Sequence, residues 1–84
     1  MASMYYIGLD VHKKTISYCV KDVSGRIHLE GTIPATRIDL DRWIRILPQP
    51  WMAAMEATVL TGSIYDHLFP HAEAMKVAHP LMLR

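Results

Sequence analysis

Residues 5–14 read Tyr-Tyr-Ile-Gly-Leu-Asp-Val-His-Lys-Lys, a run of apolar residues that ends in a basic segment. Its first seven residues are almost wholly apolar and rich in residues that favour strands, which predicts a strand buried on both faces of a sheet. Asp10 is the one acidic residue inside this strand and lies near its carboxyl end. The basic residues that follow are expected to form the turn after the strand.

Two segments of alternating polarity follow this first strand. Residues 15–21 alternate apolar and polar side chains, and residues 26–33 do so again. Between them, Asp-Val-Ser-Gly at 22–25 has the composition of a turn. The opening third therefore predicts three antiparallel strands, with one set of apolar residues on the covered face: Ile16, Tyr18, Val20, Ile27, Leu29 and Ile33.

Two short helices are expected further along the chain. Thr36, with Asp39 three residues later, resembles a capping box at the start of the first helix. Apolar residues at helical spacing form one stripe on it and another on the second helix, which opens at residues 61–63 and ends at Pro70. The two stripes are Leu40, Trp43, Ile44 and Leu47, then Leu60, Ile64 and Leu68.

Residues 51–56 and 72–78 predict two further strands, and His79-Pro80 is expected to begin another element. The order β-β-β-α-β-α-β predicts an α/β fold, a mixed sheet with helices packed on it. Strands separated by a helix are expected to be parallel and joined by right-handed crossovers. Trp43 lies on a helical stripe and Trp51 begins a buried strand, so both are expected in the core rather than on a base-stacking surface.

Composition narrows the class of protein. The 84 residues are 51 % hydrophobic and 20 % charged, which excludes an intrinsically disordered chain. The formal net charge is +1, so the chain has no overall excess of positive charge that would attract a polyanion. Cys19 is the one cysteine, which excludes a disulfide framework. No apolar run approaches the ~18 residues of a membrane span. Residues 1–4 lack signal-peptide character and are expected to be a cloning scar, so we expect a cytoplasmic protein.

Asp10 and Glu56 lie near the carboxyl ends of two apolar strands. If those strands are adjacent and parallel, both carboxylates emerge at the sheet edge where α/β folds place their ligands. Two carboxylates there suit magnesium, which takes one or two protein carboxylates and keeps several waters. The alternative is that Asp10 caps the following turn and Glu56 caps the second helix.

His12, Lys13 and Lys14 lie in the turn after the first strand, one residue beyond Asp10. A basic turn beside a metal site would help to hold a nucleic-acid backbone, because an ammonium group contacts phosphate well. The alternative is that the two lysines are solvated turn residues, as charged side chains on exposed turns usually are.

Three segments carry a resemblance to a known family. They are Tyr-Ile-Gly-Leu-Asp-Val-His-Lys-Lys at 6–14, Met-Glu-Ala-Thr at 55–58 and Val-Ala-His-Pro at 77–80. In this order they resemble the N-terminal half of the RuvC-like catalytic domain of insertion-sequence transposases, in particular the IS-one-ten family with its DEDD acidic tetrad. The resemblance implies an RNase H-like fold over residues 5–84, truncated before the later helices.

The resemblance also implies a function. Asp10 and Glu56 match the first two letters of the tetrad, and in the complete site they would bind two magnesium or manganese ions for DNA strand cleavage and joining in transposition. The other two acidic ligands and a serine nucleophile would lie outside this chain, so the chain alone is expected to be inactive. DNA, a structured guide RNA and further copies of the chain are the expected partners.

Two other functions stay open on the sequence. The opening strand also resembles the phosphate-binding half of an actin-like or sugar-kinase ATPase, although residues 11–14 stand where those proteins usually place Gly and Thr or Ser. The third possibility is a non-catalytic module that self-associates through an unfinished sheet edge.

Overall fold

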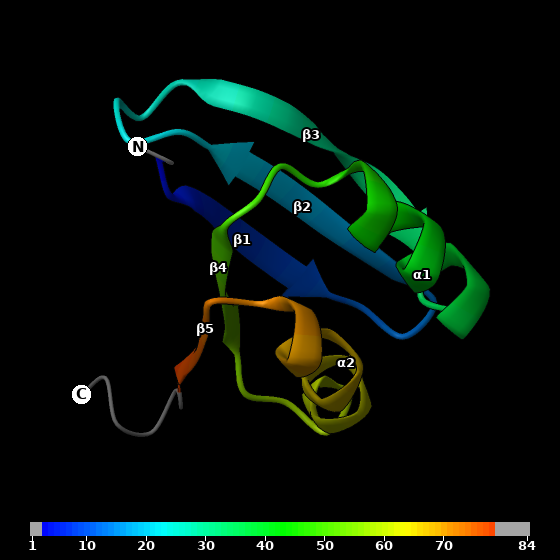
Figure 1. Cartoon of the computed structure of the whole chain (residues 1–84). Helices are drawn as coiled ribbons and strands as arrows, with labels where there is room; N and C mark the ends of the chain where they lie inside the picture. The colour runs from blue at the N-terminus through cyan, green and yellow to red at the C-terminus, as the bar shows by residue number, and fades with distance from the viewer. Residues whose placement is uncertain (1–2, 79–84) are drawn as a thin grey trace.

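The computed structural model describes residues 3–78, which form five strands, two α-helices and a 3-10 turn (Figure 1). The element expected at His79-Pro80 lies outside the described residues, as do residues 1–2 of the expected scar. The elements are β1 (Tyr5–Val11), β2 (Thr15–Lys21), β3 (Ile27–Pro34), α1 (Arg37–Ile46), β4 (Trp51–Glu56), α2 (Thr61–Leu68), η1 (Phe69–His71) and β5 (Ala74–Ala78).

The strands form one mixed sheet in the order β3-β2-β1-β4-β5. β1 and β2 pair antiparallel, as do β2 and β3, whereas β1 with β4 and β4 with β5 pair parallel. The connections through α1 and α2 both run in the direction from β3 towards β5, so right-handed crossovers place both helices on the same face of the sheet (Figure 1). The expected α/β class, element order and strand directions are therefore confirmed.

The core lies between this face and the two helices. Its most completely buried side chains come from β2, β4 and α2, and they are Ile16, Val20, Trp51 and Leu68. The stripe expected on α1 faces the same core, with Leu40 and Trp43 each 2 % exposed. Both tryptophans are core residues, as their positions predicted.

The prediction that the first strand is buried on both faces is wrong, and the strand at residues 51–56, expected to be buried, is also covered on one face only. On β1, Ile7 and Leu9 are 3 % and 8 % exposed, whereas Tyr6 on the opposite face is 44 % exposed. On β4, Ala54 and Glu56 are exposed in the same way. The reason is that both helices pack on one face, so within residues 3–78 nothing covers the other. We call this second surface the open face.

A β-bulge changes the expected position of Ile27. The β2–β3 register pairs Val20 with Leu29 but Lys21 with Ile27, so the alternation shifts by one residue there. Leu29 and Ile33 are half-buried as expected, whereas Ile27 lies beside Lys21 and is 54 % exposed.

The start of α1 differs in one detail from the expected capping box. The Thr36 hydroxyl oxygen accepts a hydrogen bond from the Asp39 amide at 3.1 Å, as predicted. The Asp39 carboxylate accepts from the Thr36 hydroxyl at 2.5 Å, because Asp is too short to reach back to the Thr36 amide.

Within residues 3–78, no helix is long and apolar enough to cross a membrane.

Asp22 organises the turn between β2 and β3. Its carboxylate accepts hydrogen bonds from the Ser24 hydroxyl at 2.6 Å and from the Ser24 and Arg26 amides. Gly25 completes the turn with a φ of 86°, in the left-handed region that favours glycine. The Ser24 hydroxyl is the main cause that holds the pKa of Asp22 below its usual value, with the backbone amides and Arg26 adding to it.

We expect Asp22 to make folding stability depend on pH. A carboxyl whose pKa is lower in the folded chain stabilises the fold above its unfolded pKa, and that contribution is lost as the pH falls through the folded pKa. Asp22→Asn keeps an acceptor oxygen but removes the charge. Urea unfolding should therefore show wild type more stable than Asp22→Asn at neutral pH, with the difference shrinking below pH ~4. A difference that stays constant with pH contradicts this assignment.

Candidate functional site

Asp10 and Glu56 lie at the carboxyl ends of two adjacent parallel strands. The β1–β4 register pairs Leu9 with Met55, and each carboxylate belongs to the next residue of its strand. Because Leu9 and Met55 face the core, the alternation of the strand sends Asp10 and Glu56 to the open face. The two side chains therefore emerge side by side at one edge of that face.

Both residues line one broad hollow on the open face, with a volume of about 660 Å³. The floor of the hollow is made largely of small residues from β1, β2 and β4, among them Gly8, Cys19 and Ala54. Among the described residues that line it, Asp10 and Glu56 contribute the only carboxylates. The hollow thus combines an apolar floor with a concentrated negative charge at one end.

Neither carboxylate acts as a cap among the described residues. The carboxylate of Asp10 accepts no hydrogen bond from a backbone amide of the turn that follows it, and α2 has no side-chain cap at its N-terminus. Thr58 and Thr61 organise the turn before α2 instead. The alternative in which Asp10 and Glu56 serve as local caps is therefore wrong for this structure, and both carboxylates remain available to a ligand.

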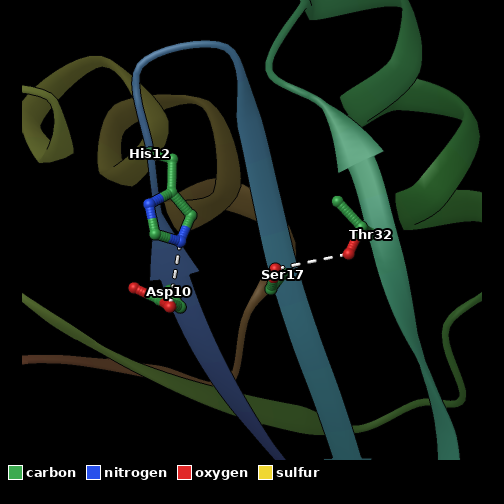
Figure 2. Close-up of polar contacts among 4 residues, drawn as sticks. All are labelled: Asp10, His12, Ser17 and Thr32. Carbon is green, nitrogen blue, oxygen red and sulfur yellow. Dashed lines mark hydrogen bonds and ion pairs between the residues drawn. The ribbon is translucent and has the colours of Figure 1, made fainter.

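His12 contacts Asp10 at the end of β1. Its Nε2 lies 3.0 Å from Oδ2 of Asp10, and Figure 2 shows the ring above the carboxylate. The two side chains are 56 % and 73 % exposed. Such an exposed pair contributes less than about 1 kcal/mol to folding, so His12 does not prevent a stronger ligand from binding Asp10.

Lys13 and Lys14 do not reach the hollow. Both are exposed in the turn between β1 and β2, and neither lines the hollow that contains Asp10. The turn is closed by hydrogen bonds from the His12 amide to the Thr15 carbonyl and from the Ala35 amide to the Lys14 carbonyl. Of the five expected site residues, the structure thus places Asp10 and Glu56 in one hollow and His12 against Asp10 alone, and it leaves the two lysines outside the hollow.

A polar row extends from Asp10 across the neighbouring strands. Ser17 pairs with Asp10 in the register, and its hydroxyl lies 3.3 Å from that of Thr32 on β3 (Figure 2). The alternation of residues 15–21 placed Ser17 on the polar side, but only the strand register reveals that it lies beside Asp10. The row adds two hydroxyl groups that can donate or accept hydrogen bonds next to the acidic edge.

Thr58 and Thr61 shape the chain directly after Glu56. The Thr61 hydroxyl donates to the Glu56 carbonyl at 2.8 Å, and its oxygen accepts from the Thr58 amide at 3.0 Å. The Thr58 hydroxyl oxygen accepts a hydrogen bond from the Leu60 amide at 3.1 Å, and Thr58 itself lines the hollow. Sequence reasoning missed this pair, although threonines two and five residues after an acidic strand end are a visible signal.

The donor set of this edge fits a hard divalent cation that keeps most of its water. Two carboxylates supply negative oxygen ligands, and the residues around them supply hydroxyl oxygens. Within residues 3–78 no third His, Cys, Asp or Glu joins them in a metal-binding group. The edge therefore suits magnesium or manganese with water and phosphate oxygens as the other ligands, and it does not suit a closed zinc site.

Comparisons with known proteins identify no family for this chain. No family model matches the sequence, and no curated protein matches it either.

Proposed function

We propose that this chain is the metal-binding part of a RuvC-like, RNase H-like catalytic domain of a DNA transposase or recombinase. In this proposal Asp10 and Glu56 hold magnesium or manganese, with two ions in the complete site, and the partner is DNA. For the whole protein, the resemblance adds a structured guide RNA, and the uncovered open face favours self-association.

One observation carries the proposal. Asp10 and Glu56, which lie 46 residues apart in sequence (56 − 10), emerge from adjacent parallel strands on the same exposed face and in the same hollow. Two like charges on neighbouring strands repel each other. If neither carboxylate bound a ligand, replacing one of them by a neutral residue would therefore stabilise the fold. Their position at the carboxyl ends of the central parallel strands also matches the place where α/β sheets bind ligands.

The residues around the carboxylates have complementary roles in this proposal. A bound magnesium ion would supply positive charge that stabilises the anionic oxygens of a phosphodiester in displacement. Ser17 and Thr32 would donate hydrogen bonds to the nucleic-acid backbone beside the metal edge. Lys13 and Lys14, exposed in the turn after β1, would neutralise more distant phosphates.

A DNA-binding measurement with and without metal tests the proposal. In EDTA, Glu56→Gln should bind a short fluorescent DNA duplex more tightly than wild type, because it removes a negative charge that repels phosphate. With magnesium the order should reverse, since only wild type retains the carboxylate that holds the ion. Fluorescence anisotropy at low ionic strength measures both arms.

Lysine variants provide the matched control. Replacing Lys13 and Lys14 by Gln should reduce the slope of log K against log salt by about 1 for each lysine. Lys21→Gln also removes one positive charge, as each of these two substitutions does, but it lies at the opposite end of β2, far from the acidic edge. It should therefore alter the slope less than either of them. The proposal fails if magnesium weakens DNA binding equally in wild type and Glu56→Gln.

A further inference from the structure

The peptide unit after Glu56 is held at both ends. Its carbonyl oxygen, on Glu56, accepts a hydrogen bond from the Thr61 hydroxyl at 2.8 Å. Its amide nitrogen, on Ala57, donates to the Ala78 carbonyl of β5 at 2.7 Å. Because the peptide unit is planar, these two contacts fix its orientation and with it the direction in which the Glu56 side chain leaves the strand.

Proton accounting gives the hydroxyl chain a single direction. A threonine hydroxyl has one hydrogen, and that of Thr61 is used on the Glu56 carbonyl. In the 3.1 Å contact between the two hydroxyls, Thr58 must therefore be the donor and Thr61 the acceptor. The chain runs from the Thr58 hydroxyl to the Thr61 hydroxyl to the Glu56 carbonyl, and it leaves no hydroxyl proton free to reorient.

The Thr61 side chain serves the strand rather than its own helix. Thr61 is the first residue of α2 and is 4 % exposed, but its hydroxyl bonds backward to Glu56 and Thr58. The N-cap of α2 is Leu60, which has no side-chain hydrogen bond. The buried hydroxyl thus satisfies one carbonyl and one amide of the turn between Glu56 and α2, which are costly to leave unpaired.

We propose that Thr61 is a positioning residue for the metal site, acting through the backbone of Glu56, with Thr58 as its hydrogen-bond donor. This inference rests on the proposed function, since it assumes that Glu56 binds the cation. Residues behind a metal ligand commonly set its orientation, and their loss weakens metal binding about 10- to 100-fold. In this fold Thr61 lies behind Glu56, because its hydroxyl donates to the Glu56 carbonyl.

Titration with Mn²⁺ tests the inference in the 84-residue chain. Free Mn²⁺ is measured by electron paramagnetic resonance for wild type, Glu56→Gln, Thr61→Val and Thr61→Ser. We expect Thr61→Val to weaken Mn²⁺ binding about tenfold and Thr61→Ser to stay within about threefold of wild type. The Thr58 amide, which donates to Thr61, should exchange its hydrogen faster in Thr61→Val and at the wild-type rate in Thr61→Ser.

Ile64→Val is the control for a merely structural effect. Ile64 is a buried residue of the same helix, 6 % exposed and outside the hydroxyl chain, so this variant destabilises α2 without touching the turn. The inference is overturned if Thr61→Val binds Mn²⁺ like wild type, or if Ile64→Val weakens binding as much as Thr61→Val. Equal binding by wild type and Glu56→Gln is a different result, because it removes the metal site itself and the proposed function with it.

Discussion

Trp51→Ala is expected to remove about half of the stability of this domain. The side chain of Trp51 is 0 % exposed and belongs to the core cluster that joins β4 to the other strands and both helices. Truncating a buried tryptophan costs about 3–5 kcal/mol, through lost apolar burial and the cavity left behind. A domain of this size has a total stability of roughly 5–10 kcal/mol, so urea unfolding should show a much lower midpoint.

Two further variants distinguish cavity formation from other effects. Trp51→Phe should cost much less, because it keeps most of the volume and also removes the indole Nε1–H, which is buried without a hydrogen-bond partner in the described chain. Val59→Ala removes apolar atoms from a residue that is 101 % exposed and should change stability by less than about 0.5 kcal/mol. A Trp51→Ala variant as stable as Val59→Ala would show that β4 is not central to the core.

The second large effect concerns metal-dependent stability. Magnesium should stabilise wild type against urea by about 2.7 kcal/mol at a concentration 100 times its Kd, because it binds the folded chain alone. Asp10→Asn should show no such gain. Without metal, this variant should be as stable as wild type within about 0.5 kcal/mol, since the Asp10 side chain is 73 % exposed and its one hydrogen-bond partner among the described side chains is His12.

This combination separates a site residue from a fold residue. A substitution in the core lowers stability under all conditions, whereas Asp10→Asn should change only the response to magnesium. A large loss of stability in metal-free Asp10→Asn would mean that Asp10 holds the β1–β2 turn instead. An equal magnesium response in both proteins would place the cation elsewhere.

Local patterns predicted most of the fold. The alternation of residues 15–21, the helical stripe that contains Trp43 and the prolines after it each reflect a single element packing against one core, so periodicity reports them directly. The parallel pairing of β1 with β4 also follows from general rules, because a helix between two strands makes a crossover. These features suffice to bring Asp10 and Glu56 to one edge.

Features that depend on contacts between elements were not predictable in this way. Whether the opposite face of β1 is covered depends on where α1 and α2 pack, and Gly8 and Tyr6 are compatible with either outcome. The bulge that exposes Ile27 is a property of the β2–β3 pairing rather than of β3 alone. The hydroxyl chain behind Glu56 requires a turn geometry that no spacing rule specifies.

Asp10 and Glu56 are expected to form one shared divalent cation site, and Mn²⁺ broadening of backbone amide NMR signals locates the bound ion. The first signals to broaden should belong to residues flanking Asp10 on β1 and Glu56 on β4. Asp10→Asn and Glu56→Gln should each remove this broadening, and the double variant should behave like either single one, because both substitutions destroy the same site. Broadening that survives in the double variant, or that begins elsewhere in the chain, would show that Asp10 and Glu56 do not form the cation site.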